Sequence, residues 1–284
     1  MGIFSDILLT ADFDRTLTAP DSTIPERNIR AIRYFIDNGG AFTVNTGRSL
    51  AMSRRFLREV PVNAPVLLYN GSAAYDLEKE EFTFCHVIDL PMARTIRFAL
   101  ERFPDMITEI HGVDAHYTFA PNQMWDAFNR FNGCKGLVVS PDSDMGPFIK
   151  MCVYGPLREG TVSSLFQGTP DEVRRCDEAE AALREAYGDK MTILRVAPRI
   201  IDLHATGISK GLAARELLEA LGRKRLVCVG DERNDLSMMD AADHSYCPAD
   251  AAIAGQYENV CPCALGAVAD VIEKKIPEIL QKQA

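Results

Sequence analysis

Short apolar runs alternate with helical segments at the N-terminal end of the chain. The runs predict strands over residues Ile7–Ala11, Ala41–Val44 and Pro65–Tyr69. Between the first two, apolar residues recur at helical spacing from a capping box at Thr23–Glu26 until the stop at Asn38. Short strands alternating with helices are typical of a parallel sheet with helices on both faces.

The C-terminal end repeats this pattern. It predicts a strand over Arg225–Val229 and helices over Ser209–Leu221, Asp235–Ala241 and Leu265–Lys275. The two ends together therefore predict an α/β fold, with a three-layer, Rossmann-like core built around a parallel sheet.

The middle of the chain has a different pattern. Its strands are mixed or aromatic, at residues 82–88, 149–153, 192–196 and 200–203, and its helices are predicted over 91–103 and 171–187. This favours an α+β domain inserted into the core. The predicted division is residues 1–78 for the first part of the core, 79–205 for the insert and 206–284 for the second part.

Composition narrows the classes of function. The 284 residues carry a net charge of −9, with 47% hydrophobic and 25% charged residues. An ordinary globular protein is expected, and the charge does not favour nucleic acid or an anionic membrane. No apolar stretch reaches the roughly 18 residues that span a bilayer, so we expect a cytoplasmic protein. The eight cysteines form no Cys-x-x-Cys pair, which favours reduced thiols, and the sequence carries no signal for an oligomeric state.

Two carboxylates follow the first strand, in Asp12-Phe13-Asp14-Arg15-Thr16. A carboxylate can attack phosphorus and form an acyl phosphate, and a second one nearby can protonate the leaving oxygen and later deprotonate water. Alone, such a pair at a strand end is more often a turn or a cap.

Polar residues also follow the second strand, in Asn45-Thr46-Gly47-Arg48. A hydroxyl and backbone N–H groups at the start of a helix can bind a phosphate oxygen, although alone this stretch is more often a helix cap, built here from Thr46 or Ser49.

Lys210 and an acidic turn complete the pattern. Lys210 opens a helix, where the helix dipole disfavours a cation, so a compensating anion would explain it, although alone a solvated surface lysine is the favoured interpretation. The turn after the strand Arg225–Val229 reads Gly230-Asp231-Glu232-Arg233-Asn234-Asp235. Paired carboxylates at a strand end suit Mg²⁺, which binds through one or two carboxylates together with substrate phosphate. Ligands of open α/β sheets lie beyond the carboxyl ends of the strands, so these scattered features are expected to converge.

Together these motifs resemble the haloacid dehalogenase superfamily, and within it the Cof-type phosphatases. The resemblance rests on Asp12-x-Asp14-x-Thr16, Thr46-Gly47-Arg48, Asn70-Gly71-Ser72, Lys210 and Gly230–Asp235, and it covers nearly the whole chain. In that family a cap domain lies between the second and third motifs, which is where the insert lies here.

The resemblance implies an Mg²⁺-dependent phosphatase acting on a small phosphorylated metabolite through an aspartyl-phosphate. It makes Asp12 the nucleophile and Asp14 the general acid/base, with Thr46 and Lys210 also catalytic. It assigns the metal to Asp12, Asp14 (by its backbone carbonyl), Asp231 and Asp235. The phosphoryl group is expected to bind at Thr46, Gly47, Arg48, Lys210 and Asn234.

Two alternatives stay open. The stretch Thr16–Pro20 also resembles phosphomutases of the phosphomannomutase type, whose fourth motif is arranged differently. A catalytically silent binding or regulatory protein of the same fold is the other alternative, although Asp12 and Lys210 are both present. Arg15 stands where the family commonly has Gly, and no rival phosphate-binding loop occurs in the sequence.

Overall fold

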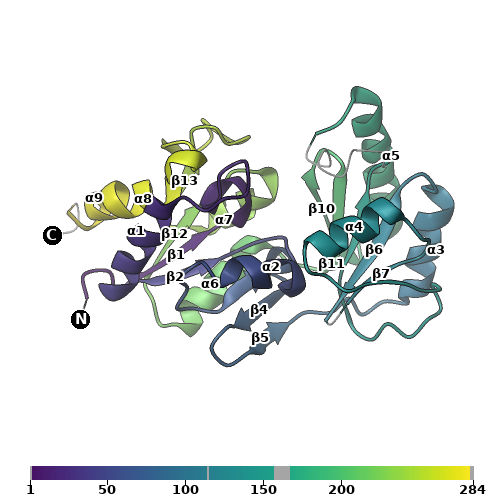
Figure 1. The fold of residues 1–284 in the computed structure, drawn as a ribbon, viewed down its shortest axis with the longest axis horizontal. Coiled ribbons are helices and arrows are strands. Elements are labelled where there is room, and N and C mark those ends of the chain that lie inside the picture. The colour runs from purple at the N-terminus through teal and green to yellow at the C-terminus, as the bar shows by residue number, and fades with distance from the viewer. Residues whose placement is uncertain (1, 114, 157–166, 282–284) are drawn as a thin grey trace. The chain divides into compact units, whose positions relative to one another are not determined.

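The computed structural model describes residues 2–113, 115–156 and 167–281, and its chain divides into two compact units (Figure 1). Unit 1 consists of Met1–Arg48, Phe56–Phe84 and Ser209–Ala284; unit 2 consists of Ser49–Arg55 and Cys85–Ile208. Unit 1 is therefore assembled from both ends of the chain. The short segment Ser49–Arg55 belongs to unit 2, which the sequence pattern did not predict.

A five-stranded parallel sheet forms the centre of unit 1, in the order β14-β13-β12-β1-β2. This confirms the predicted α/β fold with a parallel sheet. Every residue of β1 is buried, as expected for a continuous apolar run covered on both faces. The strands are β1 (Ile7–Ala11), β2 (Ala41–Val44), β12 (Arg225–Val229), β13 (His244–Pro248) and β14 (Glu258–Val260).

Helices cover this sheet, and a smaller sheet continues it. A bridge between Asn45 and Leu67 leads from β2 to the sheet β3-β4-β5. Helix α1 contacts α8, and α6 contacts α7. These elements are β3 (Val66–Leu68), β4 (Ala73–Asp76), β5 (Glu81–Cys85), α1 (Glu26–Asp37), α6 (Lys210–Ala220), α7 (Leu236–Ala241), α8 (Ala267–Asp270) and α9 (Ile276–Gln281).

The predicted start of α1 was wrong. The helix begins at Glu26, directly after Pro25, and no side chain caps it. The Thr23 hydroxyl instead donates to Asp21 Oδ1 at 2.6 Å. Proline fixes a backbone angle that suits the first turn, so this helix can start without the capping box.

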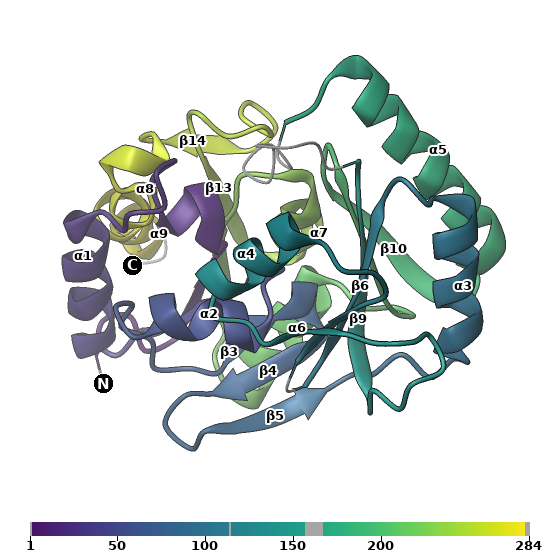
Figure 2. The ribbon, with the colours of Figure 1, turned by 45° about the vertical axis from the view of Figure 1, so that its right-hand side comes forward.

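A six-stranded sheet, in the order β10-β11-β9-β6-β7-β8, forms the centre of unit 2. Figure 2 shows α3 and α5 on one flank of this sheet and α4 on the other. The elements of this part of the chain are α2 (Leu50–Leu57), α3 (Met92–Arg102), β6 (Ile107–Gly112), β7 (His116–Thr118), α4 (Gln123–Phe131), β8 (Gly136–Val138), β9 (Phe148–Tyr154), α5 (Pro170–Tyr187), β10 (Met191–Ala197) and β11 (Ile200–Ala205).

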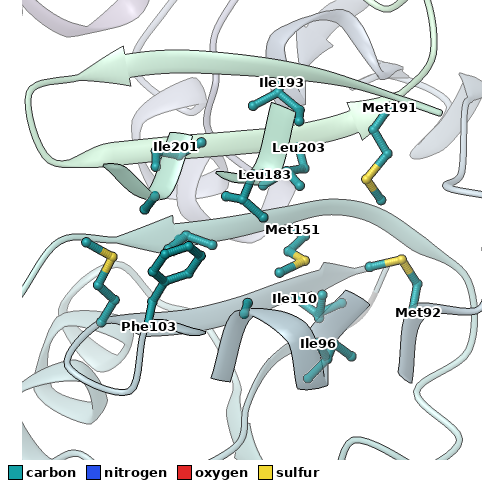
Figure 3. Close-up of a cluster of buried hydrophobic side chains, with 14 of the residues drawn as sticks. Met92, Ile96, Phe103, Ile110, Met151, Leu183, Met191, Ile193, Ile201 and Leu203 are labelled. Carbon is teal, nitrogen blue, oxygen red and sulfur yellow. The ribbon is translucent and has the colours of Figure 1, made fainter. Parts of the chain in front are cut away.

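The two faces of the unit 2 sheet differ in polarity. On one face Ile110, Met151 and Leu203 pack with Ile96 of α3 and Leu183 of α5 in an apolar core (Figure 3). Side chains alternate along a strand, so the neighbouring residues face the other way. These are polar or ionisable residues that are buried all the same: Glu109, His111, Lys150, Cys152, Asp202 and His204.

Candidate active site

Three strands of unit 1 end at the same level. Ala11 of β1 is level with Val44 of β2 and with Val229 of β12. Two hydrogen bonds continue the ladder beyond these ends, from the Asp12 N–H to the Val229 carbonyl and from the Asn45 N–H to the Ala11 carbonyl, each at 2.9 Å. The structure therefore brings the polar segments that follow three strands to one edge of the sheet.

The chain reverses tightly after Asp12. The backbone N–H of Leu17 donates to the Asp12 carbonyl at 3.2 Å, and Arg15 takes a left-handed conformation, with φ at 60°. The turn points Thr16 inward, where its hydroxyl donates to Asp231 Oδ1 at 3.0 Å. The left-handed residue explains why a glycine would suit position 15, because a Cβ is unfavourable there.

Lys210 joins two of the carboxylates. Its Nζ donates to Asp12 Oδ1 at 2.5 Å and to Asp235 Oδ1 at 2.6 Å, and it is fully buried. Ser209 caps the N-terminus of α6 through its hydroxyl, and the Lys210 carbonyl accepts from the Asn45 side chain at 2.9 Å. The compensating anions expected beside this lysine are thus two aspartates.

Asp12, Asp231 and Asp235 form what we call the aspartate cluster. One carboxylate oxygen of each lies within 4.8 Å of the others, and all three side chains are buried. One ammonium group binds two of the three carboxylates, so the cluster has more acidic than basic groups. An all-oxygen, anionic set of this kind fits a hard divalent cation such as Mg²⁺.

Burial and charge shift the pKa values in this cluster. Burial, partly offset by Lys210, raises the pKa of Asp12 to about 7. Burial and the charges of Asp12 and Asp235 raise the pKa of Asp231 to about 9. Burial alone would lower the pKa of Lys210, but the two carboxylates outweigh it and raise that pKa above its usual range. A bound cation would stabilise the charged carboxylates and so lower the pKa values of Asp12 and Asp231.

Asp235 has donors on both of its oxygens. While Oδ1 accepts from Lys210, Oδ2 accepts from the backbone N–H groups of Asp231 and Glu232, each at 3.0 Å. A Cβ added at Gly230 would lie 2.6 Å from the Asp235 Cβ, so this approach requires glycine. Asp235 therefore orients Lys210 and the Asp231 turn.

The segment after β2 is anchored to the neighbouring loop. Thr46 is buried, and its hydroxyl oxygen accepts from the Arg48 N–H at 3.2 Å. A Cβ at Gly47 would lie 2.8 Å from Asn70 Oδ1, the same oxygen that accepts from the Asn234 side chain at 3.1 Å. Asn234, predicted to bind phosphate, thus holds Asn70, which has a left-handed backbone with φ at 55°.

The Arg48 side chain binds Asp14. Arg48 Nε donates to Asp14 Oδ2 at 2.7 Å, and a terminal nitrogen donates to Oδ1 at 2.6 Å. The guanidinium also lies over the rings of Phe13 and Phe56. The sequence pattern predicted Arg48 as a phosphate ligand and did not predict this pair, because the partners are 34 residues apart.

Sequence reasoning also missed the supporting roles of Thr16 and Asn45. Both lie inside quoted motifs, so the signal was present, but their hydrogen-bond partners Asp231 and Lys210 are more than 150 residues away. Only the fold brings such pairs together.

Unit 2 contains a second buried carboxylate cluster, which we call the Glu109 network. The Glu109 carboxylate accepts from Trp125 Nε1 at 2.7 Å, Asn129 Nδ2 at 3.0 Å and the Tyr154 hydroxyl at 3.1 Å. His111 Nε2 lies 2.8 Å and His116 Nδ1 3.6 Å from its oxygens.

The two histidines of this network have parallel rings with centroids 3.8 Å apart. In-plane lone pairs of parallel rings do not converge on one point, so the arrangement suits hydrogen bonding better than metal ligation. His116 Nε2 also lies 2.9 Å from the Ser49 hydroxyl. Both histidines are buried.

Comparisons with known proteins point to one family of enzymes. Residues 9–254 match the family model of the haloacid dehalogenase-like hydrolases. The chain is 22% identical over 246 residues to the 5-amino-6-(5-phospho-D-ribitylamino)uracil phosphatase YitU of Bacillus subtilis, covering 83% of each protein. It is 22% identical over 244 residues to the HMP-PP phosphatase of Escherichia coli O157:H7, covering 84% of this chain and 82% of that one.

The fold also has solved counterparts. A haloacid dehalogenase-like hydrolase from Bacteroides thetaiotaomicron superposes with a TM-score of 0.75 at 19% identity, covering 94% of this chain and 98% of that chain. Among the residues described here, no helix has the length and apolar character needed to cross a membrane.

Proposed function

This chain belongs to the haloacid dehalogenase-like hydrolase family, and on that premise we propose that it hydrolyses a small phosphomonoester through an aspartyl-phosphate on Asp12. Named relatives are phosphatases, and the chain is a phosphoric monoester hydrolase of the Cof type. The observation that carries the mechanism is the buried Asp12 carboxylate at the end of β1, held on one oxygen by Lys210.

In the first step the free oxygen of Asp12 attacks phosphorus. An Asp12 Oδ2–P bond forms, the bond from phosphorus to the leaving oxygen breaks, and Asp14 gives its proton to that oxygen. Lys210 binds Asp12 Oδ1, which fixes the direction of attack and places a positive charge beside the transferring group. Preorganised charge of this kind is the main source of catalysis in phosphoryl transfer.

In the second step Asp14 takes a proton from water. The water oxygen attacks phosphorus, the Asp12–phosphorus bond breaks, and inorganic phosphate leaves. Thr46 supports both steps as a donor to a phosphoryl oxygen, because its oxygen accepts from the Arg48 N–H and its own proton stays available.

The donor set fits the divalent metal that this family generally uses. Asp12, Asp231 and the backbone carbonyl of Asp14 would hold Mg²⁺, and Asp235 would support the site through Lys210 and the Asp231 turn. Bound Mg²⁺ supplies positive charge that reduces repulsion between the anionic nucleophile and the anionic substrate.

The substrate class rests on the relatives. Those cited act, by their names, on a phosphorylated ribitylaminouracil and on HMP-PP. We propose a small phosphorylated metabolite of this kind.

Titration of Mg²⁺ against hydrolysis of p-nitrophenyl phosphate tests the proposal. We expect activity to depend on Mg²⁺, to vanish in excess chelator and to be absent from Asp12→Asn. A panel of phosphorylated metabolites, scored by release of inorganic phosphate, then ranks the substrates and separates hydrolysis from isomerisation by a mutase. Full activity in chelator, or isomerisation without phosphate release, would refute the proposal.

A further inference from the structure

We propose that Arg48 is a positioning residue that acts through Asp14, and that the two nitrogens which hold Asp14 do not bind the substrate phosphate. The inference rests on the proposed function, because it assigns Arg48 a task only if Asp14 is the general acid/base. Four kinds of observation carry it: the paired hydrogen bonds, the aromatic surroundings, the anchored backbone and the distribution of charge.

The hydrogen bonds fix the orientation of the Asp14 carboxylate. Two different nitrogens of Arg48 reach two different oxygens of Asp14, at 2.7 and 2.6 Å. Such a two-point pair defines both the position and the plane of the carboxylate, whereas a lysine would define only a distance. Each oxygen has a second lone pair, which can carry the proton that Asp14 gives and takes. The Asp14 side chain is about one-third exposed (34%), so few other contacts restrain it.

Aromatic rings hold the guanidinium itself in place. The Arg48 Cζ lies 5.3 Å from the centroid of Phe13 and 4.9 Å from that of Phe56, and the two rings are 5.3 Å apart. Cation–π contacts at these distances favour one position of the arginine. Phe13 stands between Asp12 and Asp14, so one tripeptide supplies the nucleophile, one of the two rings that hold Arg48, and the general acid/base.

The backbone of Arg48 is anchored as well. Its N–H donates to the Thr46 hydroxyl oxygen at 3.2 Å, and its carbonyl accepts from the Tyr69 N–H at 3.0 Å. Arg48 is thus fixed from its backbone to its guanidinium, which is the property required of a residue that positions another.

The positions of the cations near the reacting atoms also support a positioning role for Arg48. The buried cation on the nucleophile is Lys210, which contacts Asp12 directly. If Arg48 bound phosphate through the same two nitrogens, it would have to release Asp14, and the carboxylate would lose its orientation. The geometry therefore favours a division of labour, with Lys210 at the nucleophile and Arg48 at the general acid/base.

A double-mutant cycle tests this inference. Arg48→Met, Asp14→Asn and the double variant are compared with the wild type, using p-nitrophenyl phosphate as a good leaving group and an alkyl phosphate as a poor one. We expect Arg48→Met to lower kcat about 10–100-fold, as misplacement of a catalytic group does, and to leave KM within about threefold. The defect should be larger for the poor leaving group, and it should disappear in the Asp14→Asn background.

Two further variants keep the test decisive if Arg48→Met folds poorly. Phe56→Leu removes one of the two aromatic rings that hold Arg48 and retains the arginine. We therefore expect a smaller fall in kcat, which also disappears in the Asp14→Asn background. Arg58→Met removes an exposed arginine from the same region and should leave kcat and KM unchanged. Thermal melting establishes that each variant is folded.

The outcomes separate this inference from the proposed function. If Arg48→Met raises KM equally in wild type and Asp14→Asn, Arg48 binds the phosphate and the inference is wrong. Multiplicative kcat defects would also overturn it, because they mean that the two residues act independently. If Asp14→Asn itself has no effect on either leaving group, the proposed mechanism fails as well.

Discussion

Two buried carboxylate clusters in this protein balance their charge in different ways. In the aspartate cluster of unit 1, the ammonium group of Lys210 binds two of the three carboxylates, and Asp231 accepts from the Thr16 hydroxyl. In the Glu109 network of unit 2, one carboxylate accepts from an indole, an amide and a phenol and lies beside two imidazoles. The first cluster has surplus charge, whereas the second has surplus donors.

This difference in charge balance suits the aspartate cluster to catalysis and the Glu109 network to stabilising the fold. A buried carboxylate with enough donors is stable as it stands, and it holds together the elements that supply the donors. Carboxylates without enough donors cost free energy until a cation arrives, and such groups are typical of functional sites. The comparison therefore predicts opposite responses when a carboxylate is removed from each cluster.

The largest effect is expected for Asp231→Asn. Activity should fall by about 10²–10⁴-fold, because the variant loses one ligand of the metal. The charge of such a metal stabilises the transition state by several kcal/mol. In chelator the same variant should be more stable than the wild type by about 1–3 kcal/mol, since the fold no longer contains a buried carboxyl whose pKa is raised to about 9. Urea unfolding with and without Mg²⁺ measures this, with the exposed Asp37→Asn as a control. A destabilised, metal-free Asp231→Asn would contradict the comparison.

Glu109→Gln should show the reverse pattern. Glutamine keeps one acceptor oxygen but turns the other into an NH2 donor, so the donors on that side lose their acceptor and the His116 cation loses its counter-charge. Breaking a buried pair of this kind costs about 3–5 kcal/mol. Turnover per folded molecule should stay within a few-fold of the wild type. Denaturant melts and active-site titration give both quantities, and the exposed Glu101→Gln should be neutral. A large loss of kcat in folded Glu109→Gln would mean that the Glu109 network takes part in catalysis, against this prediction.

The Glu109 network should also make stability depend on pH. Burial would lower the pKa of His116, but its neighbours Cys134 and Glu109 outweigh this and raise the pKa to about 9, against 6.5 in the unfolded chain. A raised histidine pKa stabilises the fold fully below pH 6.5, and this contribution is lost as the pH rises through 9.

The expected loss is about 1–3 kcal/mol between pH 6.5 and 9. It should be absent from His116→Gln. Because Asp231 also destabilises the metal-free fold as the pH rises toward 9, the melts are run in saturating Mg²⁺, which removes that contribution. An equal pH slope in the variant would show that His116 is not the titrating group.

The smallest effect concerns Arg15. Its left-handed backbone destabilises the fold by about 1–2 kcal/mol for a residue with a Cβ, and glycine would relieve this strain. Part of the gain in stability is offset because glycine has more conformational entropy in the unfolded chain. Arg15→Gly should therefore raise stability by about 0.5–1 kcal/mol. Arg33→Gly, in the middle of α1, should instead lower it by about 1 kcal/mol. Loss of stability in Arg15→Gly would mean that the arginine side chain makes a stabilising contact.

The fold of unit 1 could be predicted because its signals are local. Continuous apolar runs marked β1, β2 and β12, and the polar segments directly after them marked the edge of the sheet. In unit 2 the short strand β8 alternates between exposed and half-buried residues, and the pattern missed it. Strands of this length contain too few residues for periodicity to stand out.

The contacts inside the sites were less predictable, for a physical reason. Motif spacing identified Asp12, Lys210 and Asp231 as candidates, but not the pairing of Arg48 with Asp14. Glu109 and its partners come from four separate elements, β6, β7, α4 and β9, with no regular spacing. Such pairs are set by tertiary packing, so a motif can identify the residues without indicating which of them touch.

The central claim is that Asp12 carries the phosphoryl group, and trapping it on Asp14→Asn tests this most directly. With a phosphorus-labelled substrate that has a good leaving group, the first step needs little protonation, whereas the second needs an activated water. Turnover should fall by about 10²–10⁴-fold, the usual worth of general acid/base help. An acid-stable, hydroxylamine-sensitive label should accumulate, and peptide mapping should place it on Asp12. A label on another residue, or near-normal turnover by Asp12→Asn, would contradict the account.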